Sequence, residues 1–148
     1  MTDQQLAQAS DTTMLALTLW REASNQPKDT QVAVAASILN RVRRPSWWGD
    51  SILAVIVKKW QYSSLTAPGD PNLVRWPHGY TPDWVLALEV AAGVMDGSLH
   101  TPTPGADSYY DVSLPTPPTW ATPETFVGQV GRMRFYNQDR DHEVAVTG

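Results

Sequence analysis

The sequence predicts a mainly α fold of the α+β class, with a small β hairpin or short strands near the C-terminus. Apolar residues recur at helical spacing over residues 12–24, 27–44 and 81–97. After Thr101 this period gives way to prolines and to polar and apolar residues in alternation. The chain has 148 residues, 42% of them hydrophobic, which is enough for a core of its own. We therefore expect residues 1–148 to form a single domain.

The first two helices are the most strongly patterned part of the chain. Asp11 is a typical N-cap for a helix over residues 12–24. A polar corner, SNQP at residues 24–27, separates it from a second helix that runs to about Arg44, since proline fits the first turn of a helix. The buried stripe of the second helix is expected at Val32, Val34, Ala35, Ile38, Leu39 and Val42.

The remaining elements follow from caps and breakers. Residues 51–60 predict a short helix capped by Asp50 or Ser51, and an irregular stretch rich in Pro and Gly follows. Thr81 caps a helix that Gly97 ends. Its buried face is expected at Trp84, Leu88, Ala91 and Met95. The segments ADSYYDV, residues 106–112, and GRMRFYN, residues 131–137, predict strands.

The composition excludes several classes of function. A net charge of -4 argues against a general nucleic-acid-binding protein. There is no Cys, and the three His residues lie far apart, so neither a disulfide nor a zinc site is expected, although Asp-based calcium binding stays open. No apolar run approaches 18 residues, and MTDQQLAQAS does not resemble a secretory signal. We expect no cofactor and no stable membrane association.

Glu22 has an unusual position on the first helix. Leu15, Leu19 and Glu22 are spaced i, i+4, i+7 and share one helix face. The leucines are expected to be buried, so Glu22 points toward the core or its edge. A carboxylic acid beside apolar groups favours its protonated form, which a general acid requires. The alternative is a boundary residue that pairs with Arg41 or Arg43 of the second helix.

Several motifs occur in a recognisable order. Glu22-Ala23 ends the first helix, and QVAVAASILNRV at residues 31–42 forms the second. Farther along the chain lie Gln61-Tyr62-Ser63, Gly105-Ala106, Pro118-Thr119-Trp120 and the segment from Gly131 to Tyr136. In this order the chain resembles, from about residue 14 to 136, the bacterial cell-wall hydrolase family that includes the spore-cortex-lytic enzymes (SleB-like). The helix pair is the most specific part of the resemblance.

The resemblance implies a lysozyme-like helical domain that cleaves peptidoglycan glycan strands between N-acetylmuramic acid and N-acetylglucosamine. The family's catalytic acid falls on Glu22. A lytic transglycosylase needs a single carboxyl and gives 1,6-anhydro-muramic ends, which is the reaction we expect. The alternatives are a muramidase with a second carboxylate and a non-catalytic glycan-binding or virion module. Candidates for a second carboxylate are Asp107, Asp111 and Asp29, the last with a simpler role as a helix cap, whereas Asp70 is most simply a turn residue.

The sequence departs from the family at three places. The family often has His where this chain has Ser108 and Met133, and a second Glu near the place of Gln26. These departures concern substrate positioning and leave Glu22 untouched. They keep the non-catalytic alternative open.

Residues for substrate binding are expected in the loop and strand regions. Gln61, Tyr62 and Ser63 are candidate polar contacts, with a plain loop after a helix as the alternative. Tyr109 and Tyr110 occupy adjacent strand positions, so they point to opposite faces and one of them can reach a cleft. Trp120 and Tyr136 serve either as packing residues or as a groove wall.

The setting expected from the sequence is a bacteriophage endolysin. A catalytic domain without a signal or a separate wall-binding domain fits a protein that accumulates in the host cytoplasm and reaches the wall once the membrane is breached. The expected partner is the peptidoglycan glycan strand, bound by a monomer.

Overall fold

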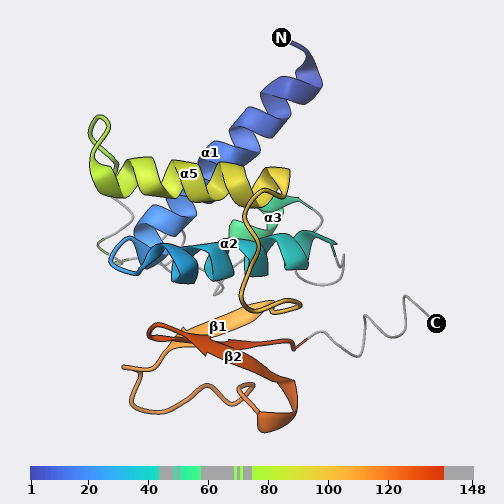
Figure 1. Ribbon diagram of the computed structural model, residues 1–148, viewed down its shortest axis with the longest axis vertical. Helices are drawn as coiled ribbons and strands as arrows, with labels where there is room; N and C mark the ends of the chain where they lie inside the picture. The colour runs from blue at the N-terminus through green and yellow to red at the C-terminus, as the bar shows by residue number, and fades with distance from the viewer. Residues whose placement is uncertain (44–48, 50, 58–68, 70, 72–74, 139–148) are drawn as a thin grey trace, which may run out of the picture.

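The structure, a computed structural model, describes residues 1–43, 49, 51–57, 69, 71 and 75–138. A helical layer lies over a three-stranded antiparallel sheet, and α2 runs between the sheet and the helices α1 and α5 (Figure 1). The helices are α1 (Asp3–Ala23), α2 (Lys28–Arg43), α3 (Ile52–Ile56) and α5 (Pro82–Asp96). The strands are β1 (Ser108–Asp111), β2 (Phe126–Val130) and β3 (Met133–Tyr136), and a short 3-10 helix, Pro123–Thr125, leads into β2. The predicted mainly α (α+β) fold is confirmed.

Helix α1 begins earlier than the sequence pattern predicts. The backbone N–H of Gln5 donates to the Thr2 hydroxyl at 3.1 Å, and the N–H of Thr2 donates to the Gln5 side chain at 2.8 Å. This reciprocal capping box starts the helix at Asp3, so the prediction of a start at Asp11 is wrong. The N-terminal half of α1 is exposed and projects beyond the other helices (Figure 1).

The core lies where the second half of α1 meets α2, α3 and α5. Residues 15–21 of α1 are buried on every side of the helix. Of the predicted stripe of α2, Val42 is half-buried and the other residues are buried: Val32, Val34, Ala35, Ile38 and Leu39. On α5 the predicted face is only partly right, because Trp84, Leu88 and Met95 are half-buried and lie at the flank. The residues of α5 that are fully buried are small: Ala87, Val90, Ala91, Gly93 and Val94. Small side chains there let α5 approach α1 and α2 closely.

The sheet has the order β1-β3-β2, and its two faces differ. Tyr109 pairs with Phe135 and Tyr110 with Arg134 across β1 and β3. Met133 and Phe135 face the helices and join the core. The opposite face, which we call the outer face, therefore carries Tyr110, Arg134 and the other residues in register with them. Strand β2 is an element that the sequence analysis missed, since Gly128 and a bulge interrupt its alternation.

Side chains of α2 fasten the sheet to the helices. The Asn40 amide donates to the carbonyl of Ala106 at 2.8 Å, and Arg41 Nε donates to the carbonyl of Asp107 at 2.5 Å. Both acceptors lie just before β1, so the start of the sheet is fixed to the last turns of α2. Across the described ranges, no helix has both the length and the apolar character that a membrane span requires.

Candidate active site

Glu22 lies in the last turn of α1, where its side chain is half-buried. Its neighbours Arg21 and Ala23 are both buried. The predicted position, at the edge of the core on the face of Leu15 and Leu19, is confirmed. A carboxyl group there is partly shielded from water.

The segment that precedes α5 is clamped onto this turn by two cation–π pairs. Arg21 donates from Nε and Nη2 to the carbonyl of Arg75, at 3.2 and 2.7 Å. The Arg21 guanidinium lies 4.6 Å from the ring centroid of Trp76, and the Arg75 guanidinium lies 4.8 Å from that of Trp20. Because Arg21 covers one side of the Trp76 ring and the residue stays 58% exposed, an open indole surface stands beside the last turn of α1.

Asp83 ties the start of α5 to the same part of α1. Trp20 Nε1 donates to Asp83 Oδ2 at 2.8 Å, and the Thr81 hydroxyl and the Trp84 N–H donate to Oδ1 at 2.5 and 2.9 Å. These hydrogen bonds, that of Thr81 first and that of Trp20 second, lower the pKa of Asp83. Asp83 is therefore a charged anchor at neutral pH and not a general acid.

After Glu22 in the chain comes the α1–α2 corner, and the turn between β2 and β3 rests on it. Gly131 has a φ of +56°, and a Cβ there would lie 2.7 Å from Thr30 Oγ1 and 3.5 Å from Gln26 Oε1. Beneath the corner, Gln31 is fully buried and its Nε2 donates to the carbonyl of Gln26 at 3.1 Å. The residues that follow Glu22 are thus held by the sheet, as those before it are held by the segment at Arg75.

Both positions where the family often has histidine are buried here, one in the core and one in a hydrogen-bonded cluster at the start of β1. Met133 is buried in the core. Ser108 is buried at the start of β1, where its hydroxyl donates to Asp107 Oδ1 at 2.9 Å and accepts from Gln138 Nε2 at 2.7 Å. Asp107 is itself fully buried and accepts from the N–H of Gln138 at 2.9 Å. The Asp107 carboxylate therefore links the start of β1 to the residues that follow β3, which is a structural role.

The other candidates for a second carboxylate also have structural partners. Asp29 accepts the backbone N–H of Thr30 at 2.8 Å in the first turn of α2. Asp111 accepts the N–H of Ser113 at 2.8 Å, and this bond is the main reason why the pKa of Asp111 is lowered. Asp70 lies outside the described residues. Asp29 is exposed beside the corner but caps α2, whereas Asp111 is partly exposed at the end of β1, where it pairs with Met133 of β3.

The predicted aromatic residues divide between the two faces of the sheet. Tyr109 packs beside Phe135 on the core side, with ring centroids 5.7 Å apart. Tyr110 lies on the outer face, so the prediction that these two tyrosines point in opposite directions is confirmed. Tyr110 and Trp120 both contact Tyr136, at 5.9 and 5.5 Å between centroids. Gln61, Tyr62 and Ser63 lie outside the described residues.

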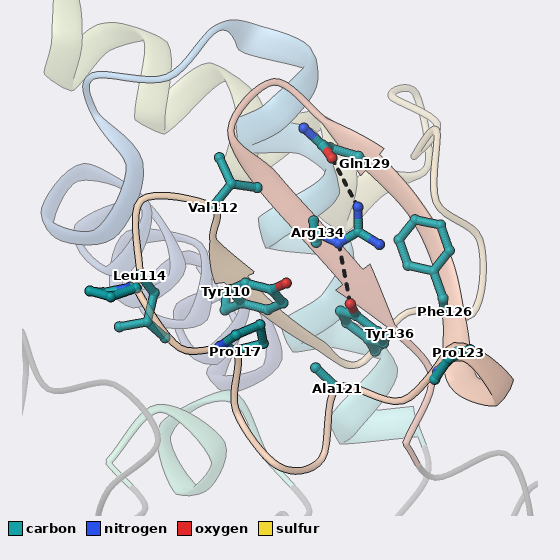
Figure 2. A pocket seen from close by; sticks show the side chains of 11 residues that line it. Tyr110, Val112, Leu114, Pro117, Ala121, Pro123, Phe126, Gln129, Arg134 and Tyr136 are labelled. Carbon is teal, nitrogen blue, oxygen red and sulfur yellow. Dashed lines mark hydrogen bonds between the residues drawn. The ribbon is translucent and has the colours of Figure 1, made fainter.

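The outer face is hollowed into a pocket of about 720 Å³ (Figure 2). Its lining consists of residues from β1, β2, β3 and the proline-bearing loop between β1 and β2: Tyr110, Val112, Leu114, Pro115, Pro117, Ala121, Pro123, Phe126, Gln129, Arg134 and Tyr136. We call this the outer-face pocket. Three of these lining residues, Phe126, Gln129 and Arg134, are not predicted from the sequence. The alternation over residues 132–136 was the signal that placed Arg134 opposite the core.

Comparison with known proteins gives the family. Residues 25–136 match the family described as Cell Wall Hydrolase. The chain belongs to the cell-wall hydrolase family. It is therefore a cell-wall-degrading enzyme, as predicted. The matched residues begin just after Glu22, and they include the second helix, the β1 segment and the motif that ends at Tyr136. No curated protein matches the chain.

Two solved structures have a similar fold. The chain is similar to the catalytic domain of the germination-specific lytic transglycosylase SleB from Bacillus anthracis, with a TM-score of 0.66, 24% identity, and coverage of 85% of this chain and 93% of that chain. It is also similar to the catalytic domain of the Bacillus cereus SleB protein, with a TM-score of 0.67, 23% identity, and coverage of 86% and 90%. At these identities the likeness shows the fold. The predicted SleB-like recognition is confirmed.

Proposed function

We propose that this enzyme is a lytic transglycosylase that cleaves peptidoglycan between N-acetylmuramic acid and N-acetylglucosamine, with Glu22 as acid and base. Membership of the cell-wall hydrolase family and the fold shared with a domain described as a lytic transglycosylase support the proposal. The observation that carries it is the place of Glu22. Its carboxyl is half-buried at the end of α1, with Trp76 fixed to the preceding residue and the Gly131 turn seated on the following corner.

The proposed reaction needs one carboxyl group in two protonation states. Protonated Glu22 donates its proton to the glycosidic oxygen as the bond from that oxygen to C1 of the muramic sugar breaks. Positive charge then develops at C1 and the ring oxygen. The 6-hydroxyl of the same sugar attacks C1, and the Glu22 carboxylate takes its proton. The products are a 1,6-anhydro-muramic end and a new 4-hydroxyl, and the carboxyl group returns to its starting state.

The surroundings of the aspartates favour this single-carboxyl route over a muramidase. Asp107 and Asp29 are held by hydrogen bonds that stabilise the sheet and α2. Asp111 stays the alternative, because it is partly exposed and its lowered pKa keeps it charged. A muramidase that used Asp111 would release reducing muramic ends.

A gel assay with embedded, purified peptidoglycan separates this enzyme from a non-catalytic module with the same fold. Wild type is expected to clear the wall around its band, and Glu22→Gln is expected to leave it intact. The matched control is Glu89→Gln, because Glu89 is an exposed glutamate of α5 that pairs with Lys28 of α2. This variant should clear the wall like wild type. Clearing by Glu22→Gln would show that Glu22 is not the catalytic acid. An intact wall around the wild-type band would favour the non-catalytic binding module.

The proposed setting is lysis of a bacterial host by a bacteriophage endolysin that is made in the cytoplasm and acts as a monomer. The experiment is expression in a bacterium with and without a membrane-pore-forming protein. Lysis is expected when the pore protein is present and absent when it is not. Lysis without the pore protein would show that this chain reaches the wall by another route.

A further inference from the structure

The outer-face pocket is built from aromatic rings and has no part in the chemistry at Glu22. Tyr136 stands at its centre. Tyr110 stacks on Tyr136, Phe126 meets its ring edge at 5.4 Å between centroids, and Trp120 meets it at 5.5 Å. These rings form a continuous wall along β1, β2 and β3. Aromatic walls with a few polar groups are typical of sites for small molecules and sugar units.

Arg134 supplies the positive charge of this pocket (Figure 2). Its guanidinium lies 4.3 Å from the ring centroid of Phe126. Nε donates to the Tyr136 hydroxyl at 3.3 Å, and Nη1 donates to Gln129 Oε1 at 3.2 Å. All of these partners are neutral. Within the described part of the chain no carboxylate forms an ion pair with Arg134, whereas its strand neighbour Arg132 approaches Asp111 at 3.5 Å.

This arrangement presents a fixed guanidinium to a ligand. The ring of Phe126 and the two hydrogen bonds hold the Arg134 side chain in one orientation, so less side-chain entropy is lost when a ligand binds. The Tyr110 hydroxyl also interacts with the guanidinium, so the charged group lies among neutral side chains of the pocket lining. Arginine pairs with carboxylates through parallel N–H donors, and such charged hydrogen bonds are stronger than neutral ones.

We propose that the outer-face pocket binds a carboxylate-bearing sugar unit of the peptidoglycan strand, with the aromatic rings against the sugar and Arg134 on the carboxylate. This inference rests on the proposed function, since that function supplies the ligand. The carboxylate has two possible sources: the lactyl group of a muramic residue without its peptide, or the stem peptide. Either one presents a carboxylate beside a pyranose ring.

The outer-face pocket and the turn that touches the α1–α2 corner share the β2–β3 hairpin. Gly131 touches the α1–α2 corner, and Arg134 lies three positions later in β3. A strand rises about 3.3 Å per residue, so the two positions are about 10 Å apart along β3. A glycan held in the pocket is therefore held by the hairpin whose turn rests on the corner that follows Glu22. We expect the pocket to set which sugar of a strand is presented for cleavage.

The test is binding to three soluble oligosaccharides, measured by calorimetry with Glu22→Gln as the parent protein to prevent turnover. The probes are peptide-free glycan with its lactyl carboxylates, glycan that keeps its stem peptides, and a chitin tetrasaccharide that has no carboxylate. Arg134→Gln should weaken binding of at least one carboxylate-bearing probe about tenfold or more, because it removes a charged hydrogen bond. Binding of chitin should stay unchanged.

Arg132→Gln is the matched control, since it removes an exposed arginine two positions away, and it should bind all three probes like the parent. Arg134→Lys keeps the charge without the planar donor pair and should bind with intermediate affinity. Weaker binding of the peptide-free glycan identifies the lactyl group, and weaker binding of the peptide-bearing glycan alone identifies the stem peptide.

Equal affinities of Arg134→Gln and its parent for every probe would overturn the inference, as would an equal loss for chitin. If Arg134→Gln does not fold, unchanged affinities of Arg134→Lys for both carboxylate-bearing probes would overturn it. Release of fragments by wild type is measured separately. Failure of the proposed function would appear there, and failure of this inference would appear in the binding series.

Discussion

Gly131→Ala tests whether the β2–β3 turn is seated on the corner that follows Glu22. Two costs add at this position. An alanine at a φ of +56° is in the left-handed region, which costs about 1–2 kcal/mol. Its Cβ would also lie 2.7 Å from Thr30 Oγ1, and relief of such crowding costs about 1–3 kcal/mol. We expect a total loss of unfolding free energy of roughly 2–5 kcal/mol.

Gly97→Ala is the control that separates the two costs. Gly97 ends α5 with a φ of +82°, and nothing lies within 4 Å of the place of its Cβ. It should therefore lose about 1–2 kcal/mol from the backbone alone. Thr30→Ala removes the crowding atom, so in the Gly131→Ala/Thr30→Ala double variant the losses should be less than additive by about 1 kcal/mol.

Urea unfolding, followed by circular dichroism, measures these differences. In a chain of this size each kcal/mol corresponds to about 3 °C in Tm, so thermal unfolding offers a second readout. Activity on peptidoglycan should also fall more in Gly131→Ala than in Gly97→Ala at a temperature where both are folded, because the turn rests on the corner that follows Glu22. Equal destabilisation of the two variants, with additive behaviour of Thr30→Ala, would refute a turn packed on the corner.

Three further predictions concern stability. The pKa of Asp83 is lowered in the folded state, so its contribution to the free energy of unfolding is present above its unfolded pKa of about 4 and is lost as the pH falls toward the folded value. In Asp83→Asn the free energy of unfolding, measured in urea, should therefore fall less than in wild type between about pH 5 and about pH 2. Phe135→Ala empties a fully buried core position and should cost about 3–5 kcal/mol in urea unfolding, and a loss below about 1 kcal/mol would contradict the packing. Lys28→Ala breaks an exposed pair with Glu89 and should change the unfolding free energy by less than about 1 kcal/mol; a larger loss would contradict its classification as a surface pair.

Local signals predicted the helices well where caps and breakers were unambiguous. The corner at Pro27 and the helix between Thr81 and Gly97 follow from residue types that fit a single position in a helix. The start of α1 was missed because Thr2 and Gln5 cap the helix ahead of the apolar pattern, so periodicity alone placed the start too late. Strand β2 was missed because a bulge breaks its period.

The candidate site could be predicted in part for the same reason. Glu22 was found because its position depends on the spacing along one helix. The pairing of Arg21 with Trp76 joins residues 55 positions apart, and no local pattern predicts which aromatic ring meets which arginine. Likewise the alternation in β3 placed Arg134 on the outer face, but its neutral partners came from the pairing of β3 with β2.

The most direct measurement of the central claim is mass spectrometry of fragments released from purified peptidoglycan in ¹⁸O-labelled water. The account predicts 1,6-anhydro-muramic ends without ¹⁸O from wild type and from Glu89→Gln, and no fragments from Glu22→Gln. Reducing muramic ends that carry ¹⁸O would contradict it, because water would then be the nucleophile. Glu22-dependent release of such ends would direct attention to Asp111 as a second carboxylate.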